Sequence, residues 1–334
     1  MKTILLVLLW VTANVLAKKS SPYNLREGPK HFEDFIDAHN KIYHSDDEKA
    51  KRYEIFLKNL EHINQLNAEN NYTEFGVNKF TDLTLQEFLA SVTCFKAPSE
   101  FPKRCRLITP QTINKSKDLG LPTQFDWRDK NVVSGVKNQG RCGSCWAFST
   151  IGNVESINAI KTGQLVELSA QQLVDCVEIN SGCTGGSSEM AIMYLVSNGS
   201  MSSASYSYDA TQKQCRYDSA KVAVKVKDCI RLMGEGEDFI AEKLVEIGPL
   251  SIEVDAVPLM NYNGGVISGD TCRKNRRVSH QVLLVGYGVE NNMPYWVMKN
   301  SWGEDFGEKG YFRMQRGMDC LGFNFFYSLI SAVV

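Results

Sequence analysis

The segment at residues 139–150, QGRCGSCWAFST, constrains this chain more than any other, because two cysteines three residues apart run directly into a helical pattern. Apolar side chains recur from there at helical spacing, at Phe148, Ile151, Val154, Ile157 and Ile160. Gly163 then supplies a typical helix stop. The sequence therefore predicts a mostly buried helix that begins at or near Cys145 and ends near Gly163.

Two cysteines at this spacing could hold a metal, exchange electrons or supply a nucleophile. A structural zinc site needs four ligands, but the chain has no second C-x-x-C pair and only one histidine, His280, after residue 120. Redox dithiols usually belong to a thioredoxin-like βαβ pattern, which is absent, and a secretory route would oxidise such a pair. The pattern therefore argues against zinc and favours redox chemistry only weakly.

The third possibility separates the two cysteines, with Cys142 in a disulfide and Cys145 as a free thiol. At a helix N-terminus, the helix dipole and a nearby imidazolium would lower the thiol pKa from about 8.5. The result would be a nucleophilic thiolate near neutral pH. Beyond residue 120, only His280 can serve as its base, because the other four histidines come earlier: His31, His39, His44 and His62.

Three further side chains fit the same chemistry. Asn300 could orient the imidazole of His280 through its side-chain carbonyl, and Trp302 could shield that contact from water. The amide of Gln139, with the backbone N–H of Cys145, could donate hydrogen bonds to the oxyanion that forms when a thiolate attacks a carbonyl. The candidate catalytic residues are therefore Cys145, His280, Asn300 and Gln139.

The N-terminus predicts the compartment. Lys2, an apolar run over residues 4–11 and small residues up to Ala17 form a secretory signal peptide at residues 1–17. That run is far shorter than the roughly 20 residues of a membrane span, and no later stretch reaches that length. We therefore expect a soluble protein of the secretory pathway, lysosomal or extracellular. The formal net charge of −1 gives no reason to expect nucleic acid or an anionic membrane as partner.

The secretory route also bears on covalent modification. Ten cysteines in an oxidising compartment are expected to pair mostly as disulfides. Three N-x-S/T sequons are consistent with glycosylation on the same route, at Asn71, Asn114 and Asn198.

The remaining chain divides near residue 120. Residues 18–90 are charged, cysteine-free and helical in period, and residues 96–120, with three prolines, read as an extended linker. From about residue 121 the chain is rich in Gly, Cys and short β-like runs, among them residues 279–303 and 310–317. Because helical segments precede β-rich ones, we expect an α+β enzyme domain with a cleft between its halves.

One helical stripe of the first region mixes polar with apolar side chains: Glu48, Arg52, Phe56, Asn59, Ile63 and Asn67. Spacings of three and four residues put all six on one face. An ordinary amphipathic helix would leave its charges on the far side, so the stripe predicts a buried hydrogen-bonded network. A short strand is expected next, through Phe75, Val77 and Phe80.

Several motifs together resemble a known family. The stretches CGSCW, VSHQVLLVGYG and KNSWG are similar to the catalytic segments of papain-family cysteine proteases. The polar stripe matches that family's ERFNIN propeptide pattern, and a second propeptide motif is matched at Gly76, Asn78, Phe80 and Asp82. Within the cathepsin L-like group, the stretches VESINAIKTG, LSAQQLVDC and VDAVPLMNYNGGVI lean toward cathepsin O.

By this resemblance the fold is α+β and papain-like. A helical left lobe and a β-barrel-like right lobe would flank the active-site cleft, preceded by a helical inhibitory propeptide. The domains are then a signal peptide (1–17), an ERFNIN-type propeptide (18–120) and a mature peptidase domain (121–334).

The resemblance also implies disulfides, which are Cys142–Cys183, Cys176–Cys215 and Cys272–Cys320. Three cysteines remain. Cys94 and Cys105 lie in the linker and are candidates to pair with each other. Cys229 has no family partner and is expected to be a buried free thiol.

A specificity pocket is implied as well, lined by Gly185, Gly186, Ser188, Glu253, Gln281 and Phe325, with Trp302 also on the substrate path. Cathepsins L usually carry small or apolar residues where this chain has Glu253 and Gln281, so the pocket is more polar. A buried Glu253 would be costly unless paired or protonated, and a basic residue at P2, two residues before the cleaved bond, could supply its partner. The alternative is that Glu253 turns to solvent at the rim.

The implied activity is that of an endopeptidase. Cys145 attacks the peptide carbonyl to form a thioester, while His280 protonates the leaving amine and then activates water. No metal and no organic cofactor are implied. The propeptide would block the cleft as an intramolecular inhibitor, and its histidines and carboxylates predict that acid weakens its hold. The expected partners of this monomer are protein and peptide substrates and cystatin-type inhibitors.

Two other classes of function stay open. A catalytically silent homologue would act as a binding protein if the polar pocket excluded peptides, although the intact Cys, His, Asn and Gln argue against it. A transferase or deamidating enzyme could use the same residues on an acyl group, although the inhibitory leader disfavours it.

Overall fold

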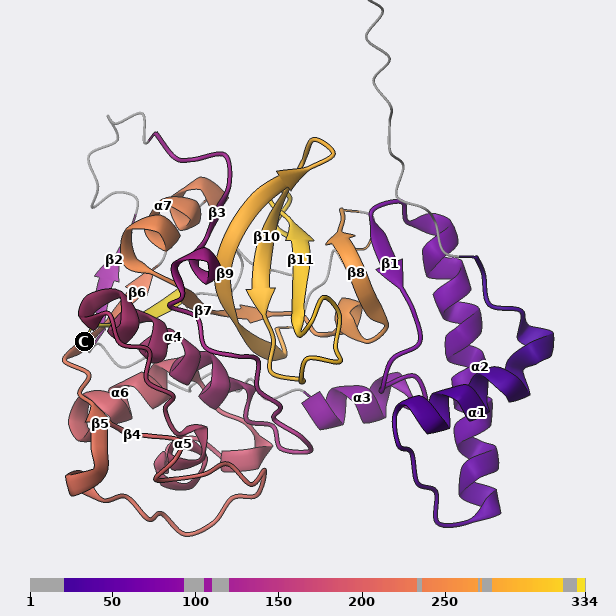
Figure 1. Cartoon of the computed structure of the whole chain (residues 1–334), viewed down its shortest axis with the longest axis horizontal. Helices are drawn as coiled ribbons and strands as arrows, with labels where there is room; N and C mark the ends of the chain where they lie inside the picture. Colours follow the sequence, from indigo (N-terminus) through magenta and orange to yellow (C-terminus); the bar gives the residue numbers. More distant parts are fainter. Residues whose placement is uncertain are drawn as a thin grey trace, which may run out of the picture.

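The computed structural model describes residues 21–92, 105–109, 120–232, 236–269, 271, 278–320 and 329–333. The signal peptide expected at residues 1–17 lies outside these ranges. The N-terminal helices lie at one end of the molecule and the helices between residues 145 and 198 at the other, and a large sheet extends between the two ends (Figure 1).

The N-terminal domain is built around one long helix, α2 (Asp46–Glu69). Its N-terminus is capped by the Ser45 side chain, which accepts a hydrogen bond from the Glu48 N–H, and three acidic residues in the first turn favour the helix dipole. Around it lie the short helix η1 (Leu25–Glu27), α1 (Gly28–Ala38), β1 (Thr73–Phe75) and α3 (Leu85–Val92). A small aromatic core joins α1 and α2 through Phe32, Phe35, Phe56 and Leu60.

The polar stripe of α2 makes the predicted hydrogen-bonded network. The Asn59 side chain donates to the backbone carbonyls of Thr81 and Leu83, at 2.7 and 2.9 Å. Asn67 both donates to the Phe75 carbonyl and accepts from the Phe75 N–H. The Asn59 amide therefore fixes the loop at residues 81–83 to α2, and the Asn67 amide fixes the end of β1 to the same helix.

The strand expected through Phe75, Val77 and Phe80 is shorter than predicted. Only Thr73–Phe75 forms β1, which pairs antiparallel with β8 (Tyr262–Ile267). Beyond it the Gly76 N–H bonds to the Asn261 carbonyl, and Asn78 and Thr81 close a turn. This turn takes Phe80 out of the strand and brings its ring to Trp302.

The helical lobe of the second region packs three helices around one apolar core. They are α4 (Cys145–Thr162), α5 (Ala170–Cys176) and α6 (Ser188–Asn198). The first confirms the predicted helix, and Gly163 ends it with a positive φ of 75°. Side chains from all three helices meet in the core, including Trp146, Leu173 and Ile192.

The sheet lobe carries one ten-stranded sheet in the order β1-β8-β11-β10-β9-β7-β12-β6-β2, with β3 paired to β9. The strands not yet defined are β2 (Arg106–Ile108), β3 (Phe125–Asp126), β6 (Asp228–Leu232), β7 (Leu250–Val254), β9 (His280–Glu290), β10 (Met293–Lys299), β11 (Tyr311–Gln315) and β12 (Leu329–Val333). The pairing of the described strands does not close, so the expected barrel is an open sheet. Strands from the predicted propeptide, β1 and β2, form its two edges.

The remaining elements are short or peripheral. They are α7 (Glu237–Ile247), the two-stranded sheet of β4 (Ser200–Met201) and β5 (Val222–Val224), and the short helices η3 (Trp127–Lys130), η4 (Gly182–Thr184), η5 (Ser219–Lys221) and η6 (Val257–Leu259). None of the helices in the described ranges is both long and apolar enough to cross a membrane.

Three disulfides are fully described. Cys142–Cys183 and Cys176–Cys215 are confirmed. The third, Cys105–Cys229, contradicts two expectations, because Cys105 does not pair with Cys94 and Cys229 is not a free thiol. The reason is that β2 runs parallel to β6, which brings the two Cα atoms to 4.7 Å.

Two predicted cysteine partners fall outside the described residues, Cys94 and Cys272. Cys320 is disulfide-bonded, and its pairing with Cys272 stays a prediction.

Candidate active site

Cys145 is the first residue of α4 and is fully buried. The backbone N–H of Gln281, on β9, points at its sulfur with a distance of 3.2 Å. The sulfur is itself part of a disulfide, so the free thiol that we expected is absent from this form of the protein. A sulfur in a disulfide cannot act as a thiolate nucleophile until it is reduced. The precursor therefore holds its candidate nucleophile in an unreactive state.

His280 begins β9 and lies beside the first turn of α4. Its Nε2 is 2.8 Å from the Asn300 Oδ1, as the sequence predicted. The Trp302 ring covers this contact, with 4.7 Å between the two ring centroids. Burial lowers the pKa of His280 to about 4, although the hydrogen bond with Asn300 and a polar contact with the Val92 backbone act in the opposite direction. In the precursor the imidazole is therefore neutral at pH 7, and the expected imidazolium is missing.

Gln139 lies on the loop before α4 and is held from two sides. Its backbone N–H donates to the Ser301 carbonyl, and the Ser301 hydroxyl donates to its Oε1 at 2.8 Å. Its Nε2 donates to the Cys142 carbonyl at 3.0 Å. In the precursor the amide predicted to serve an oxyanion thus donates to the Cys142 carbonyl.

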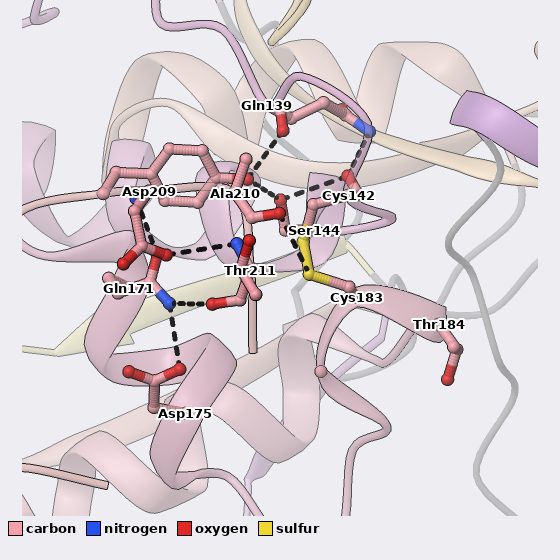
Figure 2. Close-up of a disulfide and its surroundings, with 12 residues drawn as sticks. Gln139, Cys142, Ser144, Gln171, Asp175, Cys183, Thr184, Asp209, Ala210 and Thr211 are labelled. Atoms are coloured by element: carbon pink, nitrogen blue, oxygen red, sulfur yellow. Dashed lines mark hydrogen bonds between the residues drawn. A yellow bond between two sulfur atoms is a disulfide. The ribbon is translucent and has the colours of Figure 1, made fainter. Parts of the chain in front are cut away.

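The loop that carries Gln139 and Cys142 is anchored by a polar cluster in the helical lobe (Figure 2). The Tyr208 hydroxyl donates to the Gln139 carbonyl at 2.7 Å and lies 2.6 Å from the Ser144 hydroxyl. The Cys142–Cys183 disulfide ties the same loop to η4. The sequence did not point to Tyr208, whose only local signal is its place in a tyrosine-rich stretch.

Three residues of the predicted specificity pocket, Ser188, Gln281 and Glu253, are linked by hydrogen bonds. The Ser188 hydroxyl donates to the Gln281 Oε1 at 2.8 Å, and the Gln281 Nε2 donates to the Glu253 Oε1 at 3.1 Å. Glu253 is buried, so the alternative of a solvent-facing side chain at the rim is wrong. Phe325 lies outside the described residues.

Two glycines predicted for this pocket adjoin the same region. Gly185 has a φ of 118°, which residues with a side chain rarely adopt. A Cβ on Gly186 would come within 2.6 Å of the Asn180 side chain. Both positions therefore require glycine for the chain to turn here after η4.

The N-terminal domain reaches the candidate site through aromatic rings. The rings of Phe80 and Phe88 stand edge-on to Trp302, at 5.3 and 5.7 Å between centroids. Lys79 donates to the Trp302 carbonyl and forms an ion pair with Asp305. The segment that the sequence marked as inhibitory thus contacts the tryptophan that covers His280.

The sequence did not predict a role for two further charged residues of this region, Glu189 and Arg231. Glu189 is the second residue of α6 and is fully buried, with the Arg231 Nη1 at 3.9 Å. A signal was present, because Glu189 interrupts an otherwise apolar helical stretch, and a carboxylate there must be buried or cap the helix.

Comparison with known families identifies the chain. Residues 121–326 match the model of the papain family cysteine proteases, and residues 32–88 match the cathepsin propeptide inhibitor domain (I29). The chain belongs to the papain family of cysteine proteases. This papain-family protease is therefore a cysteine-type endopeptidase made as a zymogen, and its N-terminal domain is a propeptide.

Relatives and solved structures agree with this placement. A viral cathepsin of Mamestra configurata nucleopolyhedrovirus is 41% identical over 331 residues, covering 96% of each chain. Digestive procathepsin L2 proteinase from the larval midgut of Tenebrio molitor has a TM-score of 0.85 at 35% identity, over 92% of this chain and all of that chain. A recombinant stem bromelain precursor has a TM-score of 0.81 at 33% identity, over 92% and 99% of the chains. The finer likeness to cathepsin O stays a prediction.

Proposed function

We propose that four residues carry the peptidase reaction: Cys145, His280, Asn300 and Gln139. Cys145 would attack the peptide carbonyl, and the oxyanion would accept hydrogen bonds from the Gln139 amide and the Cys145 N–H. His280 would protonate the leaving amine and then activate the water that hydrolyses the thioester, while Asn300 orients its ring. The contact between His280 and Asn300, under the Trp302 ring and next to the N-terminus of α4, is the observation that carries this proposal.

Activation in this proposal needs two events. The propeptide must leave Trp302, which would expose His280 and raise its pKa toward 6.5. An external thiol must also reduce the disulfide on Cys145 by thiol–disulfide exchange, which would free the Cys145 thiol at the helix N-terminus and the thiol of its partner cysteine while the external thiol is oxidised. Only then can the imidazole take the thiol proton and form the reactive ion pair.

The finer points of processing and setting follow from the sequence. Cleavage near Leu121 would cut the chain between the propeptide, residues 18–120, and the peptidase domain, residues 121–334, with the two pieces still joined by the Cys105–Cys229 disulfide. The signal peptide directs the enzyme into the secretory pathway, with a lysosomal or extracellular destination, where acid promotes processing. Asn71, which is exposed, Asn198 at the end of α6 and Asn114, outside the described residues, are the glycosylation sites of this proposal. The mature enzyme would act as a monomer that cystatin-type inhibitors can block.

The proposal is tested on the purified precursor and its activated form. An epoxide that alkylates active-site thiols should leave the unreduced precursor unlabelled and should label Cys145 after reduction and processing. Cys145→Ala should lower kcat/KM by about 10⁶-fold. Unchanged hydrolysis by this variant would contradict the proposal.

The product analysis separates the rival functions. Digestion of a peptide library should yield new N-termini by mass spectrometry, as expected of a peptidase. Deamidated or acyl-transferred peptides without new termini would favour the transferase class. Binding of peptides without any turnover would favour a silent homologue.

A further inference from the structure

Two segments that carry candidate catalytic residues lie side by side behind the active site. The loop at residues 134–139 ends at Gln139, and the segment at residues 299–301 closes β10 and contains Asn300. Ser301 exchanges two hydrogen bonds with Gln139, one through its carbonyl and one through its hydroxyl. The position of one segment relative to the other therefore sets the position of Asn300 relative to Gln139.

A buried charged bridge joins these two segments to α4. The Lys299 Nζ, at the end of β10, donates to the Ser134 hydroxyl at 3.0 Å. That hydroxyl donates to the Glu155 carboxylate on α4, whose other oxygen accepts from the Leu168 N–H at 2.8 Å. The side chains of Lys299, Ser134 and Glu155 are all buried. The bridge thus connects the sheet lobe with the loop before α4 and with α4 itself.

The bridge borders a cavity of about 110 Å³ between the two lobes. The lining of this cavity includes the three bridge residues, the rest of the segment at residues 299–301, and apolar side chains such as Ile151 and Leu283. A segment that faces a cavity lacks close packing on that side. Its position there depends on hydrogen bonds and ion pairs instead.

Each charge of the bridge depends on the other. Burial lowers the pKa of Lys299 to about 8, and the charge of Glu155 opposes that shift. Burial raises the pKa of Glu155, against the opposite effects of Lys299 and of the hydrogen bond from Ser134. Lys137 and Glu167, which form an ion pair nearby, act on Lys299 with opposite signs. Loss of either buried charge would therefore leave the other uncompensated.

The bridge becomes more important when the propeptide leaves. In the precursor, the rings of Phe80 and Phe88 pack edge-on against Trp302. Activation removes both rings from a residue that lies two positions after Asn300. The segment is then held by the bridge and by main-chain hydrogen bonds, such as that from the Asn300 N–H to the Gly310 carbonyl.

We propose that Lys299, Glu155 and Ser134 are positioning residues of the peptidase reaction, because they fix the two lobes to each other behind the candidate active site. Lys299 would hold the neighbouring Asn300, and Ser134 would hold the loop that ends at Gln139. All three side chains are buried, so none of them would contact the substrate. This inference rests on the proposed function and adds a set of supporting residues to it.

The hydrogen bond between His280 and Asn300 makes this role measurable. Burial lowers the pKa of His280, and the hydrogen bond with Asn300 raises it. Trp302 and the backbone of Val92 also face the ring, and Cys145 is the titratable group near it in the described residues. If Asn300 shifts, the imidazolium loses its acceptor and the pKa of His280 falls. The alkaline limb of the kcat/KM profile, which reports the loss of that proton, should then move to lower pH.

The experiment compares Lys299→Met and Glu155→Gln with the wild-type enzyme, each activated from the full-length chain by reduction and processing. Each variant should lower kcat by about tenfold to 100-fold, with KM changed less than about threefold, because the reacting groups move while the substrate contacts remain. The alkaline limb should move down by about 0.5 to 1 pH unit. The double variant should lose no more than about the larger single loss, because both charges act through one bridge. Lys130→Met and Glu178→Gln, at exposed positions of the same domain, should leave both readouts unchanged.

The outcomes separate this inference from the proposed function. If the wild-type enzyme does not hydrolyse the peptide, the peptidase proposal fails. If it does, and both variants keep kcat within about twofold and the alkaline limb in place, the bridge has no positioning role. Active-site titration corrects kcat for any loss of folded enzyme, so a merely structural role would change the titre and neither readout. If the charge variants do not fold, Ser134→Ala, which removes only the bridging hydroxyl, decides in the same way.

Discussion

The two lobes hold their halves of the candidate active site by different means. The helical lobe fixes Gln139 and Cys145 with a disulfide, Cys142–Cys183, and with hydrogen bonds around Tyr208. The sheet lobe holds His280 at the start of β9 and Asn300 just after β10, beneath the ring of Trp302. One half is tied covalently and by polar contacts, and the other is covered by aromatic packing.

Several described contacts of the propeptide fall on the sheet lobe. The Thr73 hydroxyl donates to the Val266 carbonyl, the Asn78 amide donates to the Met260 carbonyl, and the ring of Phe88 meets Trp302. His280 is thereby buried and neutral. Cys145 of the helical lobe is held separately in a disulfide. Aromatic packing therefore covers the sheet half of the candidate site, and a disulfide blocks the helical half.

The largest effect is expected on the sheet side. His280→Ala should lower kcat/KM of the activated enzyme by about 10⁴-fold or more, because no other imidazole can accept the thiol proton. Steady-state kinetics on a peptide substrate measures it, with the unfolding temperature of the precursor as a check on folding. A loss below tenfold would mean that another group is the base.

A smaller effect is expected on the helical side. Gln139→Ala should lower kcat by about 10²- to 10³-fold with KM little changed, because one oxyanion donor is lost in the transition state. Gln124→Ala, at an exposed glutamine, is the matched control. If KM rises while kcat stays constant, Gln139 binds substrate in the ground state and is no oxyanion donor.

Weakening the packing between Phe88 and Trp302 should speed proteolytic processing of the precursor. Phe88→Ala removes a fully buried ring from Trp302 and should weaken docking of the propeptide by about 3 kcal/mol, which corresponds to roughly 100-fold more open precursor. The readout is the rate at which mature enzyme cleaves a Cys145→Ala precursor at pH 7. Leu85→Ala, at an exposed position of the same helix, should change that rate little. Equal rates for both variants would show that the rings do not hold the propeptide.

A fall in pH should also favour the open form of the precursor, because it protonates His280 of the sheet lobe in that form. Burial lowers the pKa of His280 from 6.5 to about 4, so the open form takes up a proton below pH 6.5 while the closed form stays neutral until about pH 4. The closed form therefore loses stability as pH falls through this window, and processing at pH 4.5 should be up to about 50-fold faster than at pH 7. His39, whose pKa is lowered by burial and by Lys41, acts in the same direction.

The propeptide carboxylate Glu87 should not contribute to this effect. Burial raises its pKa, but hydrogen bonds from Thr84 and Arg52 outweigh burial and hold the pKa at about 2. The stability that it gives the closed form is thus lost only between about pH 4.5 and pH 2. Equal processing rates of the Cys145→Ala precursor at pH 4.5 and pH 7 would contradict the acid trigger.

The sequence predicted the elements with strong periodicity and the residues with strong chemistry. The helix from Cys145, the network around Asn59 and the contact between His280 and Asn300 all follow from spacing and residue type. These features are local, or they depend on the only histidine of the peptidase domain.

What depends on tertiary pairing was not predictable from the residues alone. Cys229 meets Cys105 only because β2 lies parallel to β6 at the edge of the sheet, and no spacing encodes that neighbour. Phe80 lies outside the expected strand because the chain turns between Asn78 and Thr81 and the Phe80 ring packs against Trp302. The role of Glu189 likewise depends on which face of β6 carries Arg231.

The bond between Cys105 and Cys229 has a consequence for the shape of the product. Residues 106–108 are an edge strand of the catalytic sheet, yet they precede the cleavage point near Leu121. A single cut there would not release the propeptide under oxidising conditions, because the Cys105–Cys229 disulfide still joins it to β6. Strand β2 would therefore continue to cover that edge of the sheet. The finished enzyme would then be a two-chain molecule, which separates into a short and a long polypeptide only when a reductant is added.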